Sequence, residues 1–300
     1  TVSHLLSSYY SCSDHDRKVK LQQEISNTIN KQLEAQAYNP SILAKLKEIN
    51  LTENNKFFLW HTWFSDVFNR EDKEGFDIVI GNPPYIGEKG HKEIFQPVKA
   101  DIHLGQYFLG KMDYFYFFFH LAFNMLSPSG VATFITTNYY PTALGARKLR
   151  ADIKDRMNIK TLFNLGELRL FENAPGQHNM ISSFAKGKDG CKCQVIDVHK
   201  KGALNPIMFA SIINHIDEDT TYADVAQEDL YDGEENYIRL QNSSGDNPLS
   251  SLLDKIQLRN NTLGNIAEVN AGIMGGCDSI TNHNMKYADA DYIQYNDIRK

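Results

Sequence analysis

The sequence has 300 residues, 42% of them hydrophobic and 23% charged, and a formal net charge of −6 at pH 7. This is the composition of a soluble globular protein, and the length suffices for one large domain or two smaller ones. No apolar run is long enough to span a bilayer. Four cysteines make no disulfide framework at this length, and the negative net charge leaves any nucleic-acid contact to local patches.

No secretory signal is visible, and the first residue is Thr1 rather than Met. We therefore expect a fragment of a longer cytoplasmic protein. Cys191 and Cys193 are close together, but without a second such pair they do not predict a zinc site. We expect no bound metal.

Residues 13–50 are predicted to form two helices with a break between them. Ser13 or Asp14 can cap the first helix, and Ser41 can cap the second. The first helix carries only a sparse apolar stripe. We expect this helical pair to have a purely structural role.

An aromatic stretch at residues 57–63 predicts a strand, which a polar connection links to a second strand at residues 76–80. The second run is short, apolar and rich in β-branched residues, as in a buried parallel strand. It stops at Gly81, and two consecutive prolines prevent it from continuing. A stiff loop therefore follows at the carboxyl end of the strand, where open α/β sheets place their ligands.

The residues of this loop suit chemistry on an amino group attached to an aromatic base. Such a nitrogen is a poor nucleophile because its lone pair is delocalised into the ring. Two acceptors that each take one of its N–H protons can pull the nitrogen toward a tetrahedral shape. The Asn82 side-chain oxygen and the Pro83 carbonyl can be these acceptors, and Pro84 restricts the backbone. Tyr85 offers a flat face against which a base turned out of the helix can stack.

With Asn-Pro-Pro-Tyr intact at Asn82 to Tyr85 after a strand, the sequence resembles the adenine-N6 DNA methyltransferases. The resemblance implies that a methyl group passes from S-adenosylmethionine to the exocyclic amine of adenine in double-stranded DNA, within a restriction–modification system. Adenine would be flipped out and held by Asn82 and the Pro83 carbonyl. Placement and desolvation, without a strong general base, would carry most of the catalysis. The alternative interpretation of residues 82–85 is a structural Pro-Pro turn after a core strand, with an Asn that has no catalytic role.

The resemblance also implies a cofactor site. In the family, an acidic residue with an apolar neighbour ends the preceding strand and contacts the adenine of S-adenosylmethionine. Asp66 and Val67 stand in the matching place, and Asn82 borders the same cofactor. Asp66 could otherwise be a surface residue that closes a strand. No Gly-rich turn, which in the family holds the methionine part, precedes Asp66, so we expect half of the site to be missing and the chain alone to be inactive.

Two groups of basic residues are candidate contacts with DNA phosphates. The glycine- and lysine-rich loop after the signature could close on DNA through Lys89 and Lys92. The predicted basic helix at residues 143–157 contributes Arg147 and Lys148. The alternative for this helix is an ordinary solvated face.

Further strands are predicted at residues 131–137, 159–165 and 178–186, and a strongly apolar helix at residues 111–126. The fold class is therefore α/β: a partial Rossmann-like methyltransferase sheet with N-terminal helices and a C-terminal segment that leads into a recognition domain. The resemblance matches Phe171 to an aromatic residue that, in related enzymes, holds the flipped adenine against the tyrosine of the signature. Phe171 could otherwise be an apolar anchor for its loop.

Beyond about residue 203 the sequence becomes acidic and rich in loops. A Leu-Gly-x-Ile-Ala-Glu-Val stretch at residues 263–269 resembles the opening of the target-recognition region in fused restriction–modification enzymes. We divide the chain into a helical segment at 1–56, a catalytic core at 57–202, and a linker with the start of the recognition region at 203–300.

Two other functions are compatible with the sequence. Methyltransferases of protein glutamine amides share the signature, because a planar amide nitrogen poses the same lone-pair problem. The Phe171 loop and the long tail suit a DNA enzyme better. The chain could instead be a DNA-binding and specificity module without catalysis. No paired carboxylates with a lysine indicate a nuclease, which could lie upstream, and the DNA sequence recognised and the oligomeric state are not determined.

Overall fold

The computed structural model describes residues 2–35, 58–171, 177–188 and 190–240, together with Ser41, Ala44 and the short stretches 285–288 and 293–295. The chain divides into two compact units, residues 1–242 and residues 243–300. In the second unit, β11 (Met285–Ala288) and β12 (Ile293–Tyr295) form an antiparallel pair. The predicted recognition stretch at 263–269 lies outside the described residues.

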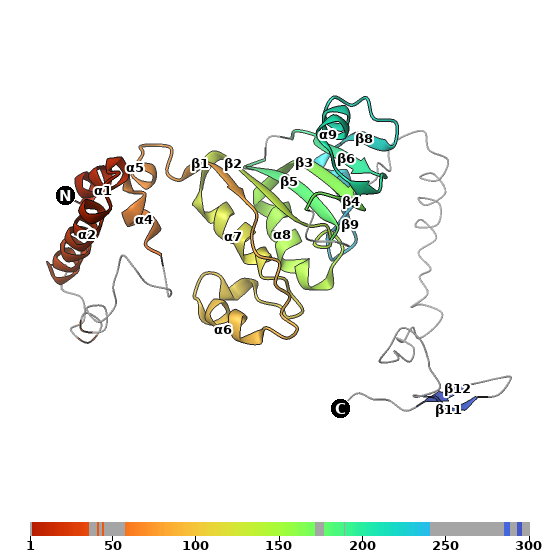
Figure 1. Ribbon diagram of the computed structural model, residues 1–300, viewed down its shortest axis with the longest axis horizontal. Helices are drawn as coiled ribbons and strands as arrows, with labels where there is room; N and C mark the ends of the chain where they lie inside the picture. Colours follow the sequence, from red (N-terminus) through yellow and green to blue (C-terminus); the bar gives the residue numbers. More distant parts are fainter. Residues whose placement is uncertain are drawn as a thin grey trace. The chain divides into compact units, whose positions relative to one another are not determined.

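A six-stranded mixed sheet forms the centre of the first unit, in the order β1-β2-β5-β3-β6-β8 (Figure 1). Its strands are β1 (Phe76–Gly81), β2 (Leu126–Thr137), β3 (Met157–Gly166), β5 (Asn179–Lys186), β6 (Cys193–Val198) and β8 (Thr220–Val225). β1 is parallel to β2 and β3 is parallel to β6, whereas β5 and β8 run antiparallel to their neighbours. One edge of the sheet therefore collects the carboxyl ends of β1, β2, β3 and β6 and the amino ends of β5 and β8.

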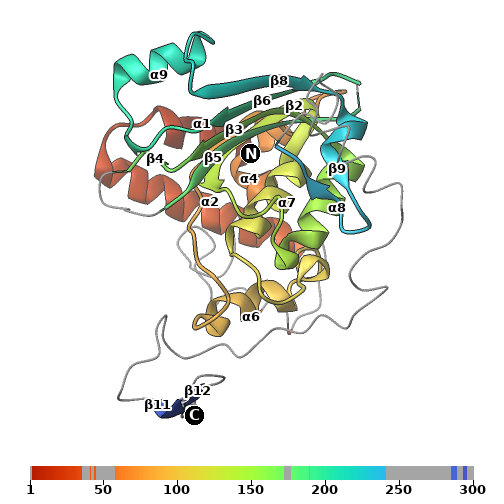
Figure 2. The same cartoon turned by 90° about the vertical axis from the view of Figure 1, so that its right-hand side faces the viewer.

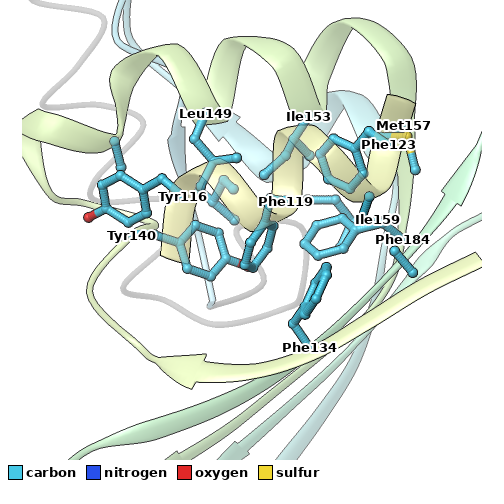
Figure 3. Packing of buried hydrophobic residues seen from close by; sticks show 14 of the residues in the cluster. Tyr116, Phe119, Phe123, Phe134, Tyr140, Leu149, Ile153, Met157, Ile159 and Phe184 are labelled. Atoms are coloured by element: carbon cyan, nitrogen blue, oxygen red, sulfur yellow. The ribbon is translucent and has the colours of Figure 1, made fainter. Parts of the chain in front are cut away.

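Helices pack on both faces of this sheet. α7 (Phe115–Met125) and α8 (Arg147–Arg156) lie side by side against one face, and α9 (Pro206–Ile213) lies on the other (Figures 1 and 2). The main core between α7, α8 and the sheet is rich in aromatic rings (Figure 3), and Phe119 stacks on Phe134 with 4.7 Å between ring centroids. The strongly apolar helix predicted from the sequence is α7, which needs apolar side chains on most sides because the sheet and α8 both pack against it.

Four strands predicted from the sequence are confirmed as β1, β2, β3 and β5, and the predicted basic helix is confirmed as α8. The class, a mixed α/β fold around one sheet, is confirmed as well. β6 and β8 were not predicted, and β8 continues the sheet past residue 202 by pairing with β6. The division of the chain at residue 202 stays a prediction, but the sheet itself extends to Val225.

The strand predicted at residues 57–63 is wrong. α4 (Trp60–Trp63) and α5 (Ser65–Phe68) are short helices in this region. The aromatic residues recur three or four positions apart, at Trp60, Trp63, Phe64 and Phe68. Helical spacing brings such residues to one side of a helix, and Trp63 is buried in a cluster with Leu6. This packing outweighs the general preference of aromatic residues for strands.

The N-terminal helices are α1 (Val2–Ser11) and α2 (His15–Ala35). α2 confirms the first predicted helix, and Asp14 caps it by accepting a 2.7 Å hydrogen bond from the backbone N–H of Arg17. Ile25 of α2 is fully buried in the cluster that also includes α1. Apart from Ser41 and Ala44, which are helical, the second predicted helix lies outside the described residues. Across the described part of the chain, no helix has the length and apolar character needed to cross a membrane.

Candidate active site

The signature Asn82 to Tyr85 lies where the strands of the sheet end. β1 stops at Gly81, and Asn82 follows with its side chain exposed while Pro83 is buried. Gly81 is needed here because a Cβ at this position would lie 2.9 Å from the Phe134 ring, closer than such atoms approach. The end of β1 can therefore pack closely against the Phe134 ring of the core, and this contact positions the start of the loop.

Tyr85 and Asn82 contact each other. The Tyr85 hydroxyl lies 2.7 Å from Asn82 Oδ1 and 3.0 Å from the backbone carbonyl oxygen of Ile135, at the end of β2. The Tyr85 ring meets the edge of Phe115, with 6.0 Å between centroids and 75° between ring planes. Burial raises the pKa of the Tyr85 hydroxyl, and a hydrogen bond from the Asn179 side chain offsets part of this rise. The signature is thus a connected unit held by β2 and α7.

A hollow of about 330 Å³ runs between β1 and α7 and reaches the signature. Asn82, Pro83 and Pro84 border it at one end, and Phe118 and Met125 of α7 line its wall. None of the residues that line it carries a charge. The ammonium and carboxylate groups of S-adenosylmethionine would find no charged partner among these side chains. The lining therefore fits the neighbourhood of the reacting amine, but not the ionic end of the cofactor.

The outer edge of β1 is open among the described residues. β1 pairs with β2 on one side, and no described strand pairs with its other side. Ile78 and Ile80 are 65% and 77% exposed, although strands in parallel pairs are usually covered on both faces. The sheet is thus incomplete, within the described part of the chain, beside the residues of the signature.

The predicted cofactor contacts Asp66 and Val67 lie on α5 and not at the end of a strand, so that part of the prediction is wrong. Asp66 is exposed. Arg70 links this helix to β1. Its Nε donates to the Val67 carbonyl at 3.2 Å, and its Nη1 donates to Asp77 Oδ2 at 2.7 Å. Hydrogen bonds from Arg70 and Lys73 lower the pKa of Asp77 to about 2. The contact of Asp66 and Val67 with a cofactor stays a prediction.

Phe171 is half-buried and follows β4 (Leu168–Arg169), which pairs with β7 (Gly202–Ala203). Within the described ranges it makes no aromatic ring contact, and the ring that meets Tyr85 is Phe115. The role of Phe171 in stacking therefore stays a prediction. Phe115 was missed because it is one aromatic residue within an almost wholly aromatic run.

Asn179 was also missed by the sequence analysis. It is the first residue of β5 and is 1% exposed. A polar side chain at the start of a predicted buried strand was the available signal. Nothing in the sequence, however, indicates that β5 enters the sheet beside β2, which is what brings Asn179 to Thr136 and Thr137 at the end of β2.

The four basic candidates differ in their surroundings. Arg147 forms an ion pair with Glu235 at 3.1 Å, and Lys148 Nζ donates to two backbone carbonyl groups at 2.5 and 2.9 Å. Lys89 and Lys92 are exposed, and in the described residues neither forms an ion pair. The basic side chains of α8 therefore hold the fold together, whereas those after the signature are available to a ligand.

Two relatives from Haemophilus influenzae, the type II methyltransferases M.HincII and M.HindII, are each 24% identical to this chain over 141 residues. The matched stretch is 47% of this chain but only 28% and 27% of those proteins. Among solved structures, the M protein of the type I restriction enzyme EcoKI is similar with 12% identity and a TM-score of 0.41, over 62% of this chain and 48% of that chain. A modification subunit of a type I restriction enzyme from Vibrio vulnificus gives 14% identity and a TM-score of 0.40, over 55% and 36%.

The family described as Eco57I restriction-modification methylase matches residues 4–171. This stretch includes the signature, α7 and three of the six strands of the central sheet, β1, β2 and β3. It covers more than half of the chain. The chain belongs to the Eco57I restriction-modification methylase family.

Proposed function

We propose that this chain forms the adenine-binding side of the active site of an adenine-N6 DNA methyltransferase, in a fused type II restriction–modification enzyme. The observation that carries the proposal is the position of Asn82, exposed at the carboxyl end of β1 and next to the buried Pro83. Membership of the family supports a methyltransferase of a restriction–modification system. The chemistry of the loop supports an amino group as the target.

The residues of the signature have separate roles in this proposal. Asn82 Oδ1 and the Pro83 carbonyl each accept one N–H of the adenine amine, which withdraws the nitrogen lone pair from the ring. Pro84 restricts the backbone that carries the second acceptor. The Tyr85 ring and Phe171, the residue matched by the resemblance, hold the flipped base. The hollow beside Asn82 is apolar, which keeps water away from the reacting nitrogen.

S-adenosylmethionine, the cofactor of this reaction, supplies an electrophilic methyl group on a positively charged sulfur. Asn82 and the adjacent prolines would border its reacting end, and Asp66 with Val67 would meet its adenine. Residues for its ionic end, including a Gly-rich turn, would come from a segment that adds strands to the open edge of β1. Ile78 and Ile80, which project from the same face of β1, support this arrangement, because exposed apolar side chains favour coverage by another element.

Double-stranded DNA is the proposed partner, and the cytoplasm the place of action. Among the basic candidates, Lys89 and Lys92 are favoured as phosphate contacts, because they follow the signature and are exposed. Arg147 and Lys148 are less favoured, because both already have partners within the chain.

The test is methyl transfer by the longer protein of which we propose this chain to be a part. DNA is incubated with S-adenosylmethionine labelled in its methyl group and digested to nucleosides, and label is expected in N6-methyl-2′-deoxyadenosine. Asn82→Ala should lower the rate by about 10²–10³-fold, as the loss of one transition-state hydrogen-bonding group does elsewhere. Because Asn82 is exposed, the free energy of unfolding of the Asn82→Ala protein should equal that of the wild type.

Asn214→Ala is the matched control. Asn214 is exposed at the end of α9, on the opposite face of the sheet from α7, and its variant should keep the full rate. Label on cytosine, or on glutamine side chains of a protein, would refute the adenine assignment. An Asn82→Ala variant as active as the control would refute the role of the signature.

A further inference from the structure

An exposed aromatic ring lies at the edge of the sheet that carries the signature. Gly81, the last residue of β1, pairs with Phe134, and β2 continues beyond this pair. Tyr139 follows two residues after the end of β2 and is 52% exposed. It is four residues from Ile135, whose carbonyl oxygen lies 3.0 Å from the Tyr85 hydroxyl. Four residues span at most about 14 Å, or about four base-pair steps of DNA, so Tyr139 can reach the same few base pairs as Tyr85.

The loop at residues 138–146 is joined to the loop after the signature. Gly145 lies against the backbone of Lys111, where a Cβ would overlap the Lys111 carbonyl oxygen. The Lys111 backbone N–H in turn donates to the carboxylate of Glu88. The next residue is Lys89, an exposed candidate for a phosphate contact. Adjoining loops therefore present an aromatic ring and a cation that suits the DNA backbone.

The backbone at Tyr139 is fixed, although its ring is exposed. The Tyr139 carbonyl accepts hydrogen bonds from the backbone N–H groups of Thr142 at 3.1 Å and Ala143 at 2.8 Å. Fully buried Arg150 donates to the carbonyls of Tyr140 at 2.9 Å and Ala143 at 2.6 Å. Tyr140 itself is fully buried in the core, so two consecutive tyrosines have opposite surroundings. A ring on a fixed backbone loses little conformational entropy when it binds.

The Tyr139 ring lies beside the imidazole of His178 without being enclosed by it. The two ring centroids are 6.5 Å apart, with 33° between the ring planes. His178 precedes β5, and its carbonyl accepts a 3.0 Å hydrogen bond from the Asn138 backbone N–H, which joins the two loops. More than half of Tyr139 stays uncovered. Flat rings of this kind stack on nucleobases with little dependence on the base.

A flipped adenine leaves a gap in the DNA stack, and its unstacking costs free energy. An aromatic side chain that enters such a gap restores contact with the neighbouring bases. We propose that Tyr139 is this residue: its ring inserts into the stack where the flipped adenine was and stabilises the flipped state. The proposal rests on the proposed function, since it assumes that an adenine leaves the duplex to reach Asn82. It assigns Tyr139 no role in methyl transfer itself.

The test is the single-turnover rate of methylation by the longer protein on two duplexes. Both contain the adenine that the wild type methylates, paired with thymine in one and opposite cytosine in the other. Tyr139→Ala should lower the rate on the paired duplex about 10- to 100-fold, the effect of losing one base–aromatic stack. On the mismatched duplex the loss should shrink to about threefold or less, because flipping is easier and no longer limits the rate. Tyr139→Phe should keep the full rate on both duplexes, since the ring stacks without its hydroxyl.

Tyr10→Ala is the matched control. Tyr10 is 54% exposed, almost as much as Tyr139, and lies on α1 among the N-terminal helices. Its variant should keep the full rate on both duplexes. The Tm of Tyr139→Ala should equal that of the wild type, because the ring that it removes is exposed.

The outcomes separate this proposal from the proposed function. Equal losses from Tyr139→Ala on the two duplexes, with or without a lowered Tm, would overturn the insertion of Tyr139, and so would no loss on either. A Tyr139→Phe protein as slow as Tyr139→Ala would also overturn it, because the hydroxyl would then carry the effect. In each of these cases, adenine methylation by the wild type leaves the proposed function standing. A wild type that methylates no adenine would overturn the proposed function, and the role of Tyr139 with it.

Discussion

The two sides of the central sheet differ in how they are covered. On β3, neighbouring residues face two separate cores: Leu162 is fully buried on the α7–α8 side and Phe163 is 4% exposed on the α9 side. On β1, by contrast, Ile80 is 77% exposed, and it lies two residues before Asn82 of the signature. The part of the sheet that stabilises the fold is therefore not the part that carries the proposed chemistry.

This difference is informative about how the site is built. α9 closes the second face of the sheet over β3 and β6 through a cluster that includes Ile212. Over β1, the described residues leave Ile78 and Ile80 uncovered. Exposed apolar side chains and an unpaired strand edge are both surfaces for association. The signature thus lies at a border where a second piece of structure is expected to complete the site.

The largest effect should come from a matched pair of substitutions on the two sides of the sheet. Ile159→Ala on β3 removes a fully buried side chain and should lower the free energy of unfolding by about 2–5 kcal/mol. Ile80→Ala on β1 should change it by less than about 0.5 kcal/mol in this chain, because the side chain is already exposed. Urea denaturation of both variants measures the difference.

The same pair can sharpen the comparison in the longer protein. If an added segment covers β1 there, Ile80→Ala should become destabilising while the effect of Ile159→Ala stays the same. A large loss of stability from Ile80→Ala in the isolated chain would contradict the open edge. A small loss from Ile159→Ala would contradict the tight packing of the covered side.

Much of the central fold could be predicted from local sequence. The apolar run before Gly81, two consecutive prolines and the apolar segment of α7 each define an element by its own composition. The aromatic residues before Asp66 misled the prediction because their composition favours a strand while their spacing fits a helix packed on α1. Composition and periodicity conflict there, and tertiary packing decides between them.

The site was only partly predictable for a different reason. Asn82 to Tyr85 are contiguous, so their association is a local property. Ile135 reaches Tyr85 only because β2 pairs with β1, and Phe115 reaches it from α7. The order β1-β2-β5-β3 also places a later strand, β5, between two earlier ones. Local patterns do not determine strand order, so these neighbours could not be found without the fold.

A second test concerns pH, because the two sides of the sheet contain different titrating groups. On the covered side, His120 of α7 is fully buried, and its Nδ1 lies 2.6 Å from Asp152 Oδ2. Tyr107 stacks on the imidazole ring, and Arg156 donates twice to Asp152. Burial lowers the pKa of His120, and the positive charges of Arg156 and Lys148 lower it further. The hydrogen bond and the charge of Asp152 act in the opposite direction. The folded protein therefore holds a neutral imidazole.

The sign of the effect follows from proton binding. Below the usual histidine pKa of about 6.5, the unfolded chain binds a proton at His120 that the folded chain does not. Stability should fall as pH decreases through this range, by up to about 1.4 kcal/mol per pH unit. On the open side, Asp77 has a pKa of about 2, so its ion pairs with Arg70 and Lys73 should weaken only as pH falls from about 4 toward 2.

Denaturation between pH 8 and pH 5 can separate these contributions. His120→Gln keeps a donor for Asp152 but cannot titrate, so its stability should depend less on pH than that of the wild type. Asp77→Asn should leave the dependence in this range unchanged. An equal dependence of the free energy of unfolding on pH in the wild type and in His120→Gln would show that His120 does not set the pH response, and would assign it to the exposed histidines.

The smallest expected effect concerns DNA contacts, and it compares Lys92 with Lys148. Lys92 begins α6 (Lys92–Ala100) and is exposed, whereas Lys148 on α8 donates to the carbonyls of Gln106 and Phe108. Lys92→Gln should leave stability unchanged and reduce the slope of log Kd against log salt by about one, the effect of losing one phosphate contact. Lys148→Gln should lower stability by about 1 kcal/mol and leave that slope unchanged.

DNA binding by the longer protein, followed by fluorescence anisotropy at several salt concentrations, distinguishes these two expected results. A reduced slope for Lys148→Gln alone would mean that DNA lies along α8, and that the contacts of Lys148 within the chain are exchanged for phosphates on binding.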